Sequence, residues 1–128
     1  MLVDTHCHLS DPAFDPDRDA VMQRMMAAGV GRAVVVASDL ARLDETLAWA
    51  GARSEFAVAT GCHPHDAGSW SPQLRDRLRG AWALPVVRAA GEMGLDYHYD
   101  NAPRDVQRAV FAEQLSLAVA DGMPAVIH

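Results

Sequence analysis

The sequence has few cysteines, no membrane-spanning run and a shortage of positive charge. Its two cysteines, Cys7 and Cys62, lie far apart, so a disulfide scaffold is not indicated. No apolar run has the length that crosses a bilayer, and no basic region followed by a long apolar stretch stands at the N-terminus. The 17 acidic against 11 basic side chains argue against a broad electrostatic grip on nucleic acid. These absences favour a cytoplasmic protein without membrane contact.

The apolar residues follow two alternating patterns. The chain has 128 residues, half of them apolar, which is the size of one ordinary domain. Five short runs rich in valine or alanine are typical of strands covered on both faces: residues 1–3, 32–38, 56–61, 84–91 and 123–127. Four stretches between them carry apolar residues at helical intervals: residues 15–28, 40–52, a segment from Pro72 after the capping Ser71, and 103–121.

Such alternation predicts parallel strands joined by right-handed helical crossovers. It leaves a doubly wound sheet or a (β/α)8 barrel, and polar residues at the ends of four of the five runs favour the barrel, whose active sites form on that face. Eight strand-helix units need roughly 200 residues or more. We therefore predict an α/β fold comprising about the first half of a TIM-like barrel, its first five strands, with residues 1–128 as a single incomplete domain.

The stretch VDTHCHL contains a metal-binding pattern at the end of the first predicted strand. Side chains alternate along a strand, so His6 and His8 share one face with Asp4, and Cys7 points to the opposite, helix-covered face. Two imidazoles on one face can bind one metal ion, and Asp4 can orient one of them. A His-x-His pair alone is a weak motif, because six histidines in a chain this short make a chance pair common.

Two further strand ends supply complementary groups. Glu92 follows a buried run and is flanked by Gly91 and Gly94, so a carboxylate enters an apolar interior, where it needs a partner or a cation. His128 ends the fifth run. In a closed barrel these residues converge with the first histidine pair, and the mixture suits zinc, manganese or iron, with magnesium less natural against nitrogen. A bridging glutamate permits two ions.

A second His-x-His follows the third run. His63 and His65 share a face if that strand extends so far, although Pro64 indicates a turn, in which case the histidines cap the next segment. Asp96 can bind substrate or cap a turn, and His98 reads as a loop residue. We keep the two histidines and Asp96 as substrate-binding candidates.

Four ordered motifs, VDTHCHL, GCHPHDA, GEMGLDYHY and FAEQLSLAVADGMPAVIH, resemble the signatures of the TatD-related metal-dependent hydrolases, within the amidohydrolase-like barrels. The resemblance covers the entire chain. It implies a TIM-like barrel and a hydrolase of ester bonds, typically a metal-dependent deoxyribonuclease that works from the 3′ end. DNA, as single strands or 3′ ends, would be the substrate.

The resemblance also implies roles for individual residues. His6 and His8 would hold one divalent ion, Glu92 would bridge both, and His128 would bind the second, the ions being zinc, manganese or magnesium. His63 would lie beside the scissile phosphate, so Glu92 and His63 are the expected catalytic residues. In the family a further histidine and an aspartate come from later strands, beyond these 128 residues.

Three alternatives stay open. The chain could belong to an amidohydrolase that cleaves an amide or C–N bond in a small molecule. It could be an inactive truncated product, or a fragment that self-associates to cover its open sheet edges. Lastly, a separate chain could supply the missing strands.

Overall fold

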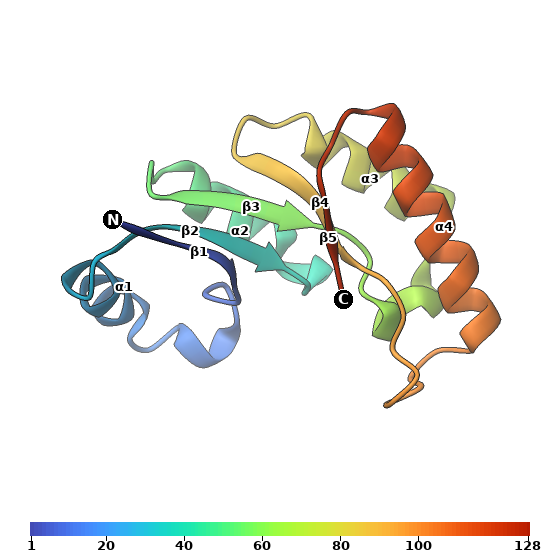
Figure 1. Cartoon of the computed structure of the whole chain (residues 1–128), viewed down its shortest axis with the longest axis horizontal. Helices are drawn as coiled ribbons and strands as arrows, with labels where there is room; N and C mark the ends of the chain where they lie inside the picture. The colour runs from blue at the N-terminus through green and yellow to red at the C-terminus, as the bar shows by residue number, and fades with distance from the viewer.

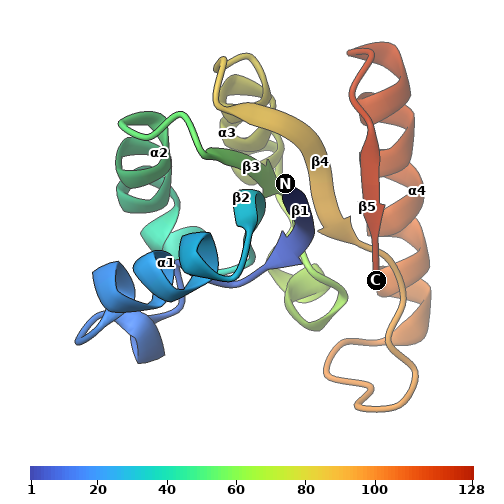
Figure 2. The same cartoon turned by 60° about the vertical axis from the view of Figure 1, so that its left-hand side comes forward.

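The computed structural model describes residues 1–128, in which five parallel strands form one curved sheet (Figures 1 and 2). The strands lie side by side in chain order: β1 (Leu2–Cys7), β2 (Val30–Ala37), β3 (Phe56–Thr60), β4 (Val87–Met93) and β5 (Ala125–Ile127). Every neighbouring pair is parallel, which confirms the predicted half-barrel of strands with crossover helices. Their carboxyl ends therefore point toward the same rim.

Four helices connect these strands and lie on the convex side of the sheet (Figure 2). They are α1 (Arg18–Ala27), α2 (Leu43–Gly51), α3 (Pro72–Trp82) and α4 (Arg104–Ala120). Both of the first two helices begin three residues later than predicted, because residues 15–17 form a turn and Leu40–Arg42 form a 3-10 helix. Ser71 caps α3 as predicted, since its hydroxyl accepts the N–H of Leu74 at 3.2 Å. None of the helices is long and apolar enough to cross a membrane.

Most buried side chains fill the layer between the sheet and the helices. Val35, Val58 and Leu78 have no exposed surface there. Cys7 and Cys62 belong to the same layer, which confirms that Cys7 faces the helices. A smaller apolar cluster, formed by Val36, Ala59 and Ala89 with the partly buried Val34 and Val126, lies apart from this layer. No helix covers the concave face of the sheet (Figure 2), so polar side chains at the strand ends can reach an open space there.

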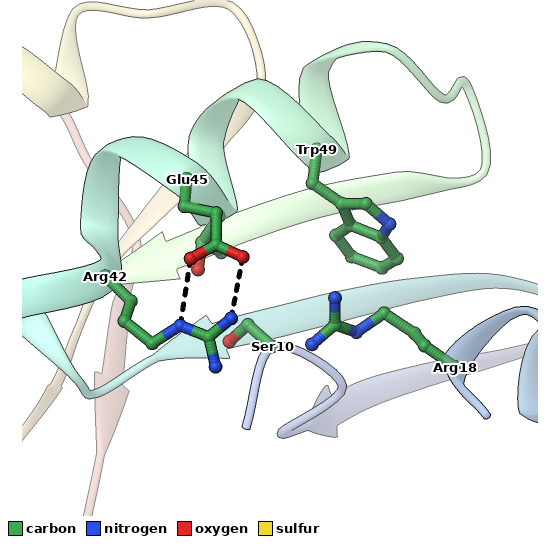
Figure 3. Close-up of a pocket in the computed structure, with 6 residues that line it drawn as sticks. Ser10, Arg18, Arg42, Glu45 and Trp49 are labelled. Carbon is green, nitrogen blue, oxygen red and sulfur yellow. Dashed lines mark hydrogen bonds and ion pairs between the residues drawn. The ribbon is translucent and has the colours of Figure 1, made fainter. Parts of the chain in front are cut away.

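An arginine cluster holds the segment that follows β1 (Figure 3). Arg42 donates hydrogen bonds to Glu45 at 2.6 and 3.0 Å and to Asp15 at 3.2 Å, and it keeps the pKa of both carboxyls below their usual range. Arg18 pairs with Asp15 and donates to the carbonyl of Leu9 at 2.7 Å. These bonds fix the backbone directly after the first histidine pair.

The closest backbone approach at the rim depends on Gly91. Its φ is +129°, and a Cβ there would lie 2.3 Å from the carbonyl oxygen of Val126 in β5. We expect Gly91→Ala to destabilise the protein by roughly 2 to 6 kcal/mol, from backbone strain and overpacking together. The helical Gly51 has no atom within 4 Å of such a Cβ, so Gly51→Ala is the matched control and should stabilise by about 0.5 to 1 kcal/mol. Urea unfolding measures both, and equal stabilities would contradict the steric argument.

Candidate metal centre

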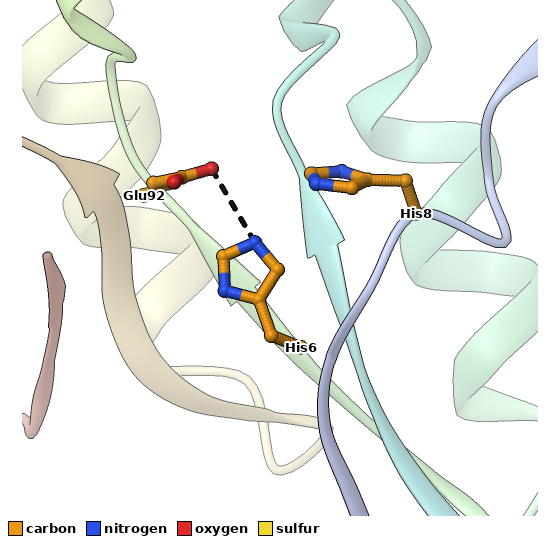
Figure 4. Close-up of side chains that lie close together, drawn as sticks. All are labelled: His6, His8 and Glu92. Carbon is orange, nitrogen blue, oxygen red and sulfur yellow. Dashed lines mark ion pairs between the residues drawn. The ribbon is translucent and has the colours of Figure 1, made fainter. Parts of the chain in front are cut away.

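The first histidine pair meets Glu92 at the rim of the sheet (Figure 4). His6 lies in β1 and His8 directly after it, with their ring centroids 5.1 Å apart. Nε2 of His6 lies 3.5 Å from Oε2 of Glu92 in β4. One potential ligand atom from each of the three residues lies within 4.8 Å of the others. The arrangement brings two nitrogens and one oxygen around a common point.

The other oxygen of Glu92 belongs to a second group. Nδ1 of His128 lies 2.9 Å from Oε1 of Glu92 and 3.3 Å from Nε2 of His63. These three residues also offer ligand atoms within 4.8 Å of one another. The two oxygens of one carboxylate therefore face two different sets of histidines.

The surroundings of Glu92 fit a pair of divalent cations. The residue is only 7 % exposed, and its ion-pair partners are His6 and His128, with no arginine among them. A buried carboxylate needs compensation, and imidazole nitrogens with carboxylate oxygens are donors for zinc and for manganese-like ions. The donor chemistry fits ions held on both sides of Glu92.

His63 is better suited to donate a hydrogen bond than to bind a metal. Its Nδ1 accepts the backbone N–H of His65 at 3.2 Å, so in the neutral ring the proton sits on Nε2. Burial, followed by the neighbouring His128 and His65, lowers the pKa of His63 and favours this neutral form. Its Nε2–H points toward Nδ1 of His128 and the second group.

Asp96 caps the turn after β4, which is one of its two predicted roles. Its Oδ1 accepts the backbone N–H groups of His98 and Tyr99, each at 3.0 Å. Its Oδ2 lies 2.5 Å from Nε2 of His65 and 3.4 Å from Nε2 of His128. The Tyr99 N–H and the His65 ring, in that order, hold the pKa of Asp96 far below its usual range. The carboxylate thus orients both rings, and substrate contact by Asp96 or His65 stays a prediction.

One alternative from the sequence is confirmed and one local expectation is wrong. The third strand ends at Thr60 and a 3-10 helix begins at Pro64, so the second histidine pair lies on the turn that Pro64 indicated, and the side chain of His63 caps that helix. A bulge between Asp4 and Cys7 interrupts the alternation assumed for β1. The Asp4 carboxylate accepts the backbone N–H of His6 at 3.0 Å and, contrary to expectation, orients no imidazole ring.

The cysteines play no part in this centre. Burial raises the pKa of Cys62 to about 11, and its thiol lies 3.4 Å from the carbonyl oxygen of Asp66. Burial also raises the pKa of Cys7, whose thiol lies 3.4 Å from the carbonyl oxygen of Val34. Both are therefore protonated packing groups at neutral pH.

Two buried glutamines on α4 hold the site loops, and the sequence reasoning missed them. Gln114, which has no exposed surface, accepts the N–H of Cys62 at 2.8 Å and donates to its carbonyl at 3.0 Å. Gln107, two helical turns earlier, accepts the N–H of Asp96 at 2.8 Å and donates to its carbonyl at 3.2 Å. Their signal in the sequence is two amides spaced seven residues apart on a helix face that is otherwise apolar.

Part of this centre lines an open hollow of about 750 Å³, which has no hydrophobic residue in its wall. Its lining consists of His8, Asp11, Ser38, Asp39, His63, His65, Asp66, Glu92, Asn101 and His128. The hydroxyl of Ser38, one of these lining residues, is buried and has no hydrogen-bond partner. The site is suited to a polar, anionic group accompanied by cations.

Comparison with protein families matches residues 3–128 to the TatD related DNases. The chain belongs to this family. An uncharacterized metal-dependent hydrolase of Bacillus subtilis, YabD, is 37 % identical over the whole chain, and a 3′-5′ ssDNA/RNA exonuclease TatD of Enterobacter lignolyticus is 34 % identical over 99 % of it. These matches cover 50 % and 49 % of the two relatives, so the chain spans about half their length.

A solved structure confirms the fold. The chain superposes on the TatD homologue YJJV of Escherichia coli with a TM-score of 0.90 and 33 % identity, covering 99 % of this chain and 50 % of that one. The five strands and their helices therefore correspond to the first half of a TIM barrel. Metal-dependent hydrolysis is the chemistry of the family to which the chain belongs.

Replacing Gln114 tests whether α4 sets the position of His63. We expect Gln114→Leu to destabilise the protein by roughly 2 to 4 kcal/mol, because the N–H and carbonyl of Cys62 lose their partners. The ring ¹⁵N signals of His63 should shift, while those of His6 should not. Gln107→Leu is the matched control and should perturb the Asp96 turn instead. Unchanged His63 signals in Gln114→Leu would contradict this role.

Proposed function

We propose that this protein is a two-metal phosphodiesterase that removes nucleotides from the 3′ ends of single-stranded DNA. The observation that carries the proposal is the placement of the two Glu92 oxygens, one toward His6 and one toward His128. A relative named as a 3′-5′ ssDNA/RNA exonuclease supports the choice of substrate.

The side chains divide the work of such a reaction. His6, His8 and Glu92 would hold one divalent ion, and Glu92 with His128 would hold the second. Two such ions lower the pKa of an attacking water and offset charge on the phosphate. The Nε2–H of His63 would donate to a phosphate oxygen, a role that the bond between its Nδ1 and the His65 N–H prepares.

The charge of the hollow is consistent with a cation-assisted nuclease. Asp11, Asp39, Asp66 and Glu92 line it, so a phosphate would be repelled unless cations offset these carboxylates. The chain carries a net charge of −6 and cannot attract DNA broadly. Locally bound ions would confine attraction to the reacting phosphate, which suits an enzyme that takes strand ends.

The donor count indicates that residues beyond these 128 complete the centre. Each group has three side chains, but Glu92 is shared between them and His63 of the second group is assigned to the phosphate. The second position therefore keeps only Glu92 and His128, whereas catalytic zinc has three protein ligands and a water. We propose that the 128 residues form part of one domain, whose remaining ligands come from another segment or from a second chain. The outer backbone edges of β1 and β5 have no partner strand, so pairing with that segment, or self-association, would cover them.

The state of the cysteines bears on the cellular compartment in which the protein acts. Both cysteines are free thiols, and Cys62 is buried. Unpaired cysteines are typical of a reducing environment, so we infer the cytoplasm as the place of action.

Metal binding should depend on the first histidine pair and on Glu92. We expect the purified chain to retain about one zinc or manganese ion or more per molecule, and His6→Ala and Glu92→Ala to lose it, because each removes a donor from the site. Elemental analysis after gel filtration measures the ratio. The control is His98→Ala, since this histidine lies on a turn and belongs to neither donor group. Equal metal content in all four proteins would contradict the assigned ligands.

Nuclease assays test the reaction itself. With added manganese, the chain together with the segment or second chain that completes the centre should shorten a 5′-labelled single-stranded oligonucleotide one nucleotide at a time from its 3′ end. His63→Gln should lower kcat by roughly 100-fold, the usual loss for one stabilising donor, without loss of metal. Light scattering on the same sample reports self-association. Hydrolysis of a cyclic amide without any action on the oligonucleotide would replace this proposal by the amidohydrolase alternative.

A further inference from the structure

The polar hollow offers no hydrophobic side chain on which the base of a nucleotide could pack. All ten lining residues are non-hydrophobic, so the hollow suits phosphate and sugar. A nucleobase is a flat aromatic ring, and proteins that bind single strands without sequence preference stack such rings on aromatic side chains. A single-strand nuclease built on this hollow therefore needs an aromatic group at its rim.

Tyr99 is the most exposed aromatic side chain in this region. The residue is 67 % exposed and follows β4 on the connection to α4. Its ring contacts His65 and His98 edge-on, at centroid distances of 5.7 and 4.7 Å. Neither contact is a parallel stack, and most of the ring remains accessible.

The position of Tyr99 is tied to the metal centre. Oδ1 of Asp96 accepts its backbone N–H at 3.0 Å, while Oδ2 of the same carboxylate contacts His65 and His128. The buried Asp96 carboxylate therefore positions the backbone of Tyr99 and the rings of His65 and His128. Asn101, two residues further on, already lines the hollow. The ring is thus placed beside the reacting groups by a short, hydrogen-bonded path.

The neighbouring Tyr97 does not offer the same surface. Its ring lies under the guanidinium of Arg104, 4.6 Å from the centroid, and its hydroxyl accepts from Arg108 at 3.2 Å. It is also less exposed, at 38 %. Arg108 has no carboxylate within ion-pair distance, so it leaves positive charge on this side of the connection.

We propose that Tyr99 is the stacking platform for the nucleobase of the 3′-terminal nucleotide, next to the scissile phosphate. This assignment rests on the proposed nuclease function and adds a base-binding subsite to it. Stacking uses the π-face that every base has, so the subsite would hold strand ends of any sequence. It would also favour single strands, because a terminal base in a duplex is already paired and stacked.

Binding of matched oligonucleotides tests the subsite. The probe is a 5′-fluorescein-labelled single-stranded decamer, compared with the same decamer carrying an abasic site at its 3′ end, both measured by anisotropy at low temperature with manganese. We expect Tyr99→Ala to weaken binding of the intact decamer roughly 5- to 150-fold, the loss that base–aromatic stacking carries. The abasic decamer should bind equally to wild type and Tyr99→Ala. Tyr99→Phe should bind both probes as wild type does.

Tyr97→Ala is the matched control, since it removes a tyrosine from the same connection. This variant should bind the intact decamer more tightly than the abasic one by the same factor as wild type does. Metal content and thermal unfolding of each variant confirm an intact centre. If Tyr99→Ala weakens binding of both decamers equally, or weakens neither, the stacking assignment is overturned while the nuclease proposal stands. If wild type neither binds nor degrades the decamer, both proposals fail together.

Discussion

The buried carboxylate of Glu92 is the group on which the rest of the site depends. It is 7 % exposed at the end of a central strand, where an isolated charge would be costly. The fold compensates it with histidines from β1 on one side and from the end of β5 on the other. Those two strands are at opposite edges of the sheet, so curvature of the sheet, not chain proximity, brings their histidines to one carboxylate.

A second constraint comes from α4, which holds two of the turns that carry site residues. In the turn that carries the second histidine pair and the turn that carries Asp96, the backbone N–H and carbonyl of Cys62 and of Asp96 bond to side-chain amides. Gln114 and Gln107 supply them from one face of α4, so a single helix sets the relative position of both turns. Asp96 then extends the network to His65 and His128. Hydrogen bonds to buried amides are costly to lose, which gives the site rigid support before any ion or substrate binds.

The sequence predicted some parts of this arrangement well and others badly. The parallel half-barrel followed from alternating periodicities, which depend on burial and hence on local composition. The convergence of His6, His8, Glu92 and His128 followed from their place at strand ends, because parallel strands share one rim. The role of Asp4 was wrong, since its carboxylate accepts the backbone N–H of His6 and holds no ring. Of the two alternatives for the second histidine pair, the turn indicated by Pro64 is the one present, with His63 capping the 3-10 helix that follows.

By itself, the sequence determined the order and type of the elements and the identity of the donor atoms, because hydrophobic period and residue chemistry are local properties. Only the tertiary structure decided which oxygen of Glu92 faces which histidine and which nitrogen of His63 carries the proton. It alone showed that two glutamines on a helix face hold the site loops. Several of these depend on contacts between residues far apart in the chain, such as His6 with Glu92 and Cys62 with Gln114, whose distances are set by sheet curvature and helix packing.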